Sequence, residues 1–218
     1  MIYEIEKKNY KYAPFNMDEI VRYSGAKQLD ASLKSIISSC IKELDEIVIT
    51  YSVCYTIVPF NTDGKIIDFK DFKMESENLV HVLKGTDKAL IFACTIGLGI
   101  DRLIQKYSQI DTLRAVVLQA IGAERVETFT DIFLKEYEDE NNVKLTKRFS
   151  PGYGDLSLDN QRKVFALLKP EKSIGVTLNA SLLMSPSKSV TAIVGINGEC
   201  TKDEDCEVCD KLDCEFRK

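Results

Sequence analysis

The chain has 218 residues, enough for one large domain or two small ones with a buried core. Hydrophobic residues make up 44% and charged residues 29%, a balance typical of globular proteins and not of disordered chains. The formal net charge of −5, without a basic cluster, argues against binding to nucleic acid. No segment reaches the ~18 apolar residues of a membrane span, and the first residues lack a signal-peptide core, so we expect a cytoplasmic protein without a membrane partner.

The chain contains a single histidine, His81. A multi-histidine metal site is impossible with one histidine, and a Ser-His-Asp site would have to be built on this residue. His81 lies between two valines in a predicted helix, where we interpret it as structural. The sequence therefore disfavours the common histidine-dependent hydrolase sites.

Capping residues and hydrophobic patterns predict the elements of the first half of the chain. Asn16 and Asp30 are predicted N-caps of two helices, and the second helix covers residues 31–46. β-Branched and aromatic residues predict a long strand over residues 47–60. The following patterns predict a short strand over 65–69, a helix over 76–85, a strand over 88–97 and a helix over 99–109.

Residues 111–138 form the most helix-like segment of the second half. Gly122 within it costs ~1 kcal/mol relative to alanine, which indicates that another part of the chain packs closely there. The pattern then predicts a helix over 159–168, stopped by Pro170, and two strands, over 173–184 and 188–196, flanking a turn. Without internal repeats or a low-complexity linker, these elements predict a single α+β domain with an antiparallel or mixed sheet and flanking helices.

The connection KRFSPGYGD carries more functional groups than a turn requires. Ser150 precedes Pro151 and is restricted to extended backbone, and Pro-Gly at the central positions predicts a type II turn. Gly152 lets a ligand approach the main chain, Arg148 offers a planar fork of donors to a carboxylate or phosphate, and Tyr153 adds a ring with a polar tip. The set suits a small ligand with an anionic end. An ordinary surface turn with an unrelated arginine is the alternative.

Three acids on the preceding helix share one face. Glu124, Glu127 and Asp131 follow the spacing i, i+3, i+7 and continue the apolar stripe of the helix. Carboxylates on a core-facing stripe need partners, because burying an unpaired charge is costly. They pair either with Arg125 or Arg148 or with the ammonium group of a ligand. In the second case, an arginine and a glutamate together recognise an α-amino acid.

The order of these motifs resembles the activation domain of cobalamin-dependent methionine synthase. The resemblance covers residues 111–197 and rests on the helix segment AERVETFTDIFL and the later Arg-x-x-Pro-Gly-Tyr motif. A third motif, Met-x-Pro-x-x-Ser, is formed by Met184, Pro186 and Ser189. The resemblance implies the same α+β fold.

The resemblance also implies binding of S-adenosylmethionine for the reductive remethylation of cob(II)alamin. Arg148 is implied to bind the carboxylate of S-adenosylmethionine, and Glu127 its amino group. Tyr153 is implied to lie near the docked corrin and is the candidate catalytic residue. The rest of the ligand is implied to lie along the main chain of Ser150, Pro151, Gly152 and Tyr153.

The implied partners are a separate cobalamin-bearing methionine synthase or related corrinoid protein, and an electron donor such as a flavodoxin. No cobalamin-binding, homocysteine-binding or folate-binding segment is recognisable, so we expect a stand-alone protein that acts on a partner. If it is an enzyme, it transfers a methyl group from S-adenosylmethionine to cobalamin. Two alternatives stay open. The first is a non-catalytic module that binds S-adenosylmethionine or serves as a docking subunit of a corrinoid methyltransferase complex. The second is a metal-bearing electron-transfer reactivase for a corrinoid methyltransferase.

Four cysteines lie close together near the C-terminus, so we divide the chain into an activation-domain-like region, 1–199, and a cysteine-rich tail, 200–218. Their pattern, C-x5-C-x2-C-x4-C, suits a zinc site or an iron–sulfur cluster held by Cys200, Cys206, Cys209 and Cys214. Reduced thiols without a metal and a redox disulfide are the alternatives. The other cysteines lie in apolar segments and are predicted core residues: Cys40, Cys54 and Cys94.

Overall fold

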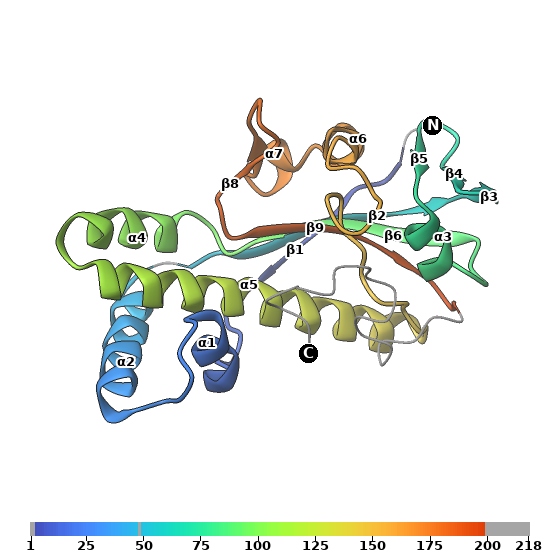
Figure 1. The fold of residues 1–218 in the computed structure, drawn as a ribbon. Coiled ribbons are helices and arrows are strands. Elements are labelled where there is room, and N and C mark those ends of the chain that lie inside the picture. Colours follow the sequence, from blue (N-terminus) through green and yellow to red (C-terminus); the bar gives the residue numbers. More distant parts are fainter. Residues whose placement is uncertain (1–2, 48, 199–218) are drawn as a thin grey trace.

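A four-stranded antiparallel sheet with the strand order β1-β2-β6-β9 runs through the centre of the protein (Figure 1). The computed structural model describes residues 3–47 and 49–198. The strands of the central sheet are β1 (Glu6–Tyr10), β2 (Tyr51–Pro59), β6 (Lys88–Thr95) and β9 (Ser189–Gly195). The predicted α+β class is confirmed, and the central sheet is antiparallel throughout.

Helices cover both faces of this sheet (Figure 1). The longest, α5 (Thr112–Asn141), has 30 residues and crosses one face. The helices that pack against α5 are α1 (Met17–Tyr23), α2 (Ala31–Asp45) and α4 (Gly99–Ile110). On the other side of the sheet lie α6 (Asn160–Leu168) and the short α7 (Pro170–Ser173). Helix α3 (Glu77–Val82) contributes Leu79 to the same hydrophobic cluster as α6.

Two small antiparallel ladders complete the described structure. One contains β3 (Asn61–Asp63), β4 (Ile66–Asp68) and β5 (Lys73–Glu75). The other pairs β7 (Thr177–Leu178) with β8 (Met184–Ser185). Within the described ranges, no helix is both long and apolar enough to cross a membrane.

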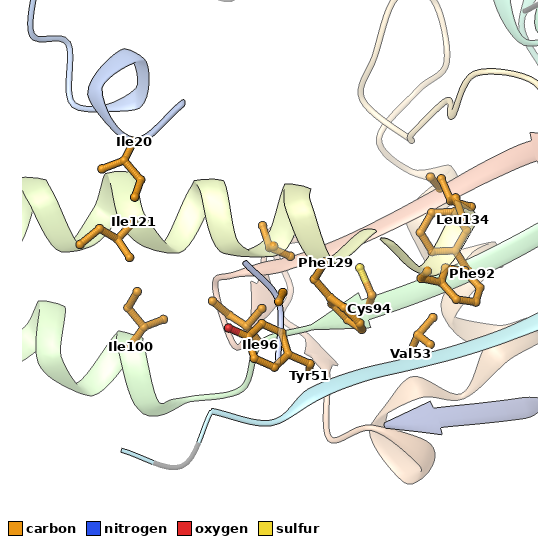
Figure 2. Close-up of a cluster of buried hydrophobic side chains, with 14 of the residues drawn as sticks. Ile20, Tyr51, Val53, Phe92, Cys94, Ile96, Ile100, Ile121, Phe129 and Leu134 are labelled. Atoms are coloured by element: carbon orange, nitrogen blue, oxygen red, sulfur yellow. The ribbon is translucent and has the colours of Figure 1, made fainter. Parts of the chain in front are cut away.

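The core consists of two hydrophobic clusters, one on each face of the sheet. Successive residues of a strand point to opposite faces, so Cys94 of β6 joins the cluster beneath α5 and Ala93 joins the other. In the first cluster, side chains of three helices meet through Ile20, Ile100 and Ile121 (Figure 2). Because both faces are buried, β6 has the continuous apolar sequence by which it was predicted.

The close approach predicted at Gly122 is present. A Cβ atom on this residue would lie 2.8 Å from Cε of Lys188 and 2.9 Å from Cδ1 of Ile100. The side chain of Lys188 therefore crosses α5 where the helix carries no side chain of its own.

The strand predicted over residues 173–184 is wrong. Only the short strands β7 and β8 are extended there. Helix α6 ends at Leu168, before Pro170 as predicted, but Pro170 is also the first residue of α7. Gly175 and Leu182 have φ values of +72° and +63°, in the left-handed region, which interrupts an extended strand. The chain therefore turns back on itself where the sequence predicted a continuous strand.

A fully buried ion pair fastens the segment before α1 to α5. The side chains of Arg125 and Glu124 are 0% and 1% exposed, and Nε of Arg125 donates to Oε2 of Glu124 at 2.6 Å. The two Nη groups of Arg125 donate to the carbonyl oxygens of Ala13 and Pro14. The guanidinium also stacks on Phe15, with its carbon 3.8 Å from the ring centroid. Arg125 therefore holds three successive residues of the segment.

Glu124 completes this attachment from the acidic side. Its Oε1 accepts hydrogen bonds from the main-chain N–H of Asn16 at 3.0 Å and from the hydroxyl of Thr128 at 2.7 Å. Each carboxylate oxygen thus has a donor, as a buried charge requires.

Arg125→Ala should lower the free energy of unfolding by about 3–5 kcal/mol, because it leaves the carboxylate of Glu124 buried without its cation. Urea unfolding at pH 7 measures the change. Lys135→Ala is the control, since Lys135 forms an exposed pair with Asp139 on the same helix and should lose about 1 kcal/mol or less. Equal losses in the two variants would contradict the role of the buried pair.

Candidate functional site

The segment that follows α5 returns along the outer edge of β9. Phe149 and Ile193 exchange main-chain hydrogen bonds of 2.9 Å in both directions, and the N–H of Thr146 donates to the carbonyl of Gly195 at 3.0 Å. Neighbouring side chains of an extended segment point to opposite sides. Phe149 therefore packs against the cluster on the α6 side, while Arg148 reaches α5.

Arg148 lies between two acids of α5. Its Nη2 donates to Oε2 of Glu127, and its Nη1 donates to Oδ1 of Asp131 at 3.0 Å. The exposed side-chain fractions are 28% for Arg148, 35% for Glu127 and 71% for Asp131. Burial disfavours the guanidinium charge, but the two carboxylates outweigh this effect and raise the pKa of Arg148. We call Arg148, Glu127 and Asp131 the charged cluster.

The third acid predicted for this face, Glu124, lies elsewhere. It is buried in the pair with Arg125, because the segment before α1 crosses α5 at this level and supplies its hydrogen-bond donors. All three acids thus contact an arginine of the chain, which is the first of the two alternatives that the sequence predicts for them.

The turn after Arg148 has the predicted type II geometry. The carbonyl of Ser150 accepts a hydrogen bond from the N–H of Tyr153 at 3.1 Å, and Gly152 has a φ of +91°. Pro151 is buried, whereas Tyr153 is 59% exposed. The corner is therefore anchored by its proline and presents the tyrosine ring at the surface.

Asp155 fixes the far end of this turn to α3. Its carboxylate accepts hydrogen bonds from the hydroxyl of Ser76, the N-cap of α3, and from the N–H of Glu77 at 2.6 Å. A carboxylate at a helix N-terminus is favoured by the unpaired N–H groups there. The local sequence predicts no role for Asp155, since the helix it contacts lies almost 80 positions earlier.

Gly154 between the tyrosine and the aspartate is required by two constraints. Its φ is +52°, and a Cβ atom would lie 2.5 Å from Oδ1 of Asn78 and 3.3 Å from Cζ of Phe149. The side chains of α3 and of the extended segment thus close around the main chain at this position.

Gly154→Ala should therefore destabilise the protein more than Gly25→Ala. Gly25 has a φ of +73°, but a Cβ atom there would meet nothing within 4 Å. We expect a loss of roughly 1 kcal/mol for Gly25→Ala, from backbone strain alone, and a further 1 kcal/mol or more for Gly154→Ala. Urea unfolding of both variants measures the difference; equal losses would mean that Asn78 and Phe149 move aside freely.

The Met-Pro-Ser element connects the start of β9 to its surroundings. Oγ of the buried Ser189 lies 2.8 Å from the carbonyl oxygen of Pro186 and 2.9 Å from Oγ1 of Thr95. Nζ of Lys188 donates to Oε1 of Gln119 at 2.6 Å, and burial lowers the pKa of this lysine. The element thus fixes β9 against β6 and α5.

A groove of about 890 Å³ adjoins the charged cluster. It is lined by the segment 14–17 and the C-terminal half of α5, and Asp131 is one of its lining residues. Phe15, Met17 and Ile132 supply apolar surface, and further acids lie along α5: Glu136, Asp139 and Glu140. Asp131 therefore borders both Arg148 and an open, acidic space.

The described cysteines are structural, as predicted. Cys40, Cys54 and Cys94 are buried and free. Sγ of Cys94 lies 3.0 Å from Oγ1 of Thr130, and burial raises the pKa of its thiol to about 12, so it stays protonated and unreactive at neutral pH.

The cysteines predicted as metal ligands lie outside the described residues, and their zinc or iron–sulfur site stays a prediction: Cys200, Cys206, Cys209 and Cys214. In the part of the chain that the structure describes, no group of three or more His, Cys, Asp or Glu side chains is placed to hold a metal ion.

Comparison with known proteins agrees with this structure. The family described as "Vitamin B12 dependent methionine synthase, activation domain" matches residues 68–202, more than half of the chain. A solved structure, "Crystal Structure of the MetH Reactivation Domain bound to AdoHcy", has a TM-score of 0.67 and covers 91% of this chain and 80% of its own. The two sequences are 14% identical, so this likeness establishes the fold alone. No curated protein sequence matches the chain.

Proposed function

Because the chain belongs to the activation-domain family of vitamin B12-dependent methionine synthases, we propose that it binds S-adenosylmethionine at the charged cluster. One observation carries the proposal: Arg148 and Glu127 lie in direct contact at the surface. Arg148 comes from the extended segment that pairs with β9, and Glu127 comes from α5. Two groups of opposite charge side by side match the carboxylate and ammonium groups of an α-amino acid.

The chemistry of each residue fits its proposed role. The guanidinium of Arg148 keeps its charge at all physiological pH values and binds carboxylates through parallel N–H groups. The carboxylate of Glu127 is partly exposed and accepts hydrogen bonds from an ammonium group. The ligand carboxylate replaces one of the two carboxylates that contact Arg148, those of Glu127 and Asp131.

The turn supplies the next part of the proposed site. Ser150, Pro151 and Gly152 follow Arg148 directly, so a ligand held by the arginine extends along their main chain. Gly152 is exposed, so a ligand reaches its main chain from the solvent side, whereas Leu158 covers the direction that a Cβ atom would take, with its Cδ1 3.2 Å away. Tyr153 is exposed at the surface end of the turn and is our candidate for the residue that contacts the corrin of a docked partner.

We propose that the protein serves the reductive remethylation of cobalamin carried by a separate methionine synthase or related corrinoid protein. S-Adenosylmethionine supplies an activated methyl group, and a flavodoxin-like donor supplies the electron. The residues of this chain bind and orient the methyl donor, which converts an encounter into an intramolecular step. Such a task requires no general base, in agreement with a chain that has one histidine.

Isothermal titration calorimetry with S-adenosylmethionine tests the binding step. The wild-type protein should bind, and Arg148→Ala should weaken binding by about 2 kcal/mol, or roughly thirtyfold, through loss of a charge-assisted carboxylate contact. Arg162→Ala is the control, because Arg162 is an arginine of α6 outside the charged cluster. No heat at millimolar ligand would refute the proposal, and unchanged affinity in Arg148→Ala would show that the site is elsewhere.

A methyl-transfer assay then separates catalysis from binding alone. The protein is mixed with a cobalamin-bearing methionine synthase, a reductant and S-adenosylmethionine labelled on its methyl group. Label on the partner's cobalamin supports remethylation. Binding without transfer supports the non-catalytic module.

A further inference from the structure

We propose that Asp131 is an internal competitor that occupies Arg148 until the carboxylate of a ligand displaces it. This inference rests on the proposed function, since it assigns a role to the second acid of the same cluster. Arg148 already contacts two carboxylates, one from Glu127 and one from Asp131. An incoming carboxylate that uses two parallel N–H groups of the guanidinium therefore meets an acid already in place.

The two acids differ in how easily they leave. Asp131 is mostly exposed and its contact to Nη1 is 3.0 Å, whereas Glu127 is only about one third exposed. Exposed ion pairs contribute little net stability, because water solvates both partners after they separate. Asp131 also lines the open groove, so its side chain has solvent to enter when it leaves Arg148. Asp131 is thus the acid that is exchanged, and Glu127 stays for the ammonium group.

This exchange makes Arg148 available only to ligands that carry a carboxylate, and it lowers the affinity for each of them because the contact with Asp131 must first be broken. Without a ligand carboxylate, Asp131 keeps the charge of Arg148 neutralised, and a ligand that lacks this group gains nothing from the arginine. Every amino acid ligand with the same head group displaces Asp131 equally. Asp131 therefore sets the affinity for the whole class of such ligands and leaves the ratio between methylated and demethylated forms unchanged.

Calorimetry of Asp131→Asn with S-adenosylmethionine tests the proposal. Removal of the competitor should tighten binding about two- to fivefold, the range expected when an exposed ion pair no longer has to be broken. Asp139→Asn is the matched control: Asp139 lies on the same helix, is similarly exposed and pairs with Lys135 at 2.8 Å. It reports the effect of removing one negative charge without freeing Arg148, and we expect unchanged or slightly weaker binding.

Decarboxylated S-adenosylmethionine provides the second arm. Asp131→Asn should not tighten the binding of this analogue, because it has no carboxylate to benefit from a freed arginine. Equal gains for both ligands, or affinity for S-adenosylmethionine in Asp131→Asn no better than in Asp139→Asn, would overturn the proposal. If none of the three proteins binds S-adenosylmethionine, the proposed function itself fails; if the wild type binds and only the gain is missing, this inference alone fails.

Discussion

The buried pair of Glu124 and Arg125 is the interaction on which the geometry of the site depends. It fastens three residues before α1 to α5, and the position of α1 and one wall of the groove follow from that attachment. Neither charge is tolerable alone in this place, because water does not reach either side chain. Each therefore has to be met by main-chain groups of the segment, and these groups are available in only one docking position. The pair fixes where the N-terminal segment lies, whatever its net contribution to stability.

Helix α5 unites the core and the site. Its inward face carries Ile121, Phe129 and Phe133 of the cluster beneath it, and its outward face carries the acids that meet Arg148. Arg148 in turn is held by an extended segment that hydrogen-bonds to β9. The two sides of the charged cluster therefore come from the longest helix and from a connecting segment that main-chain hydrogen bonds fix to the edge of the central sheet.

Local chemistry explains which features the sequence predicted. The type II turn follows from Pro151 and Gly152 alone, and most helices and the long strands follow from caps and continuous hydrophobic patterns. Features that depend on distant partners escaped prediction. The sequence does not predict strand β1, because its residues are polar and only the pairing with the distant β2 makes them a strand. Asp155 has no partner in its local sequence, because α3 lies almost 80 positions earlier. For Glu124 the sequence predicts a core-facing position and a partner, but it does not predict the donors from the segment before α1. The contact of Arg148 with Glu127 is one of the two alternatives that the complementary charges predict, the other being an ammonium group of a ligand.

The three acids of α5 that contact an arginine differ in how deeply they are buried. The exposed fraction of the side chain rises from 1% for Glu124 to 35% for Glu127 and 71% for Asp131, although all three contact an arginine. An acid without access to water cannot release its partner, because separation leaves two desolvated charges. An acid mostly in water releases it at little cost. The ion pair of Glu124 is therefore permanent, whereas the ion pair of Asp131 can be exchanged. Glu127, between these extremes, is held firmly enough to be in place and is exposed enough to accept a new partner.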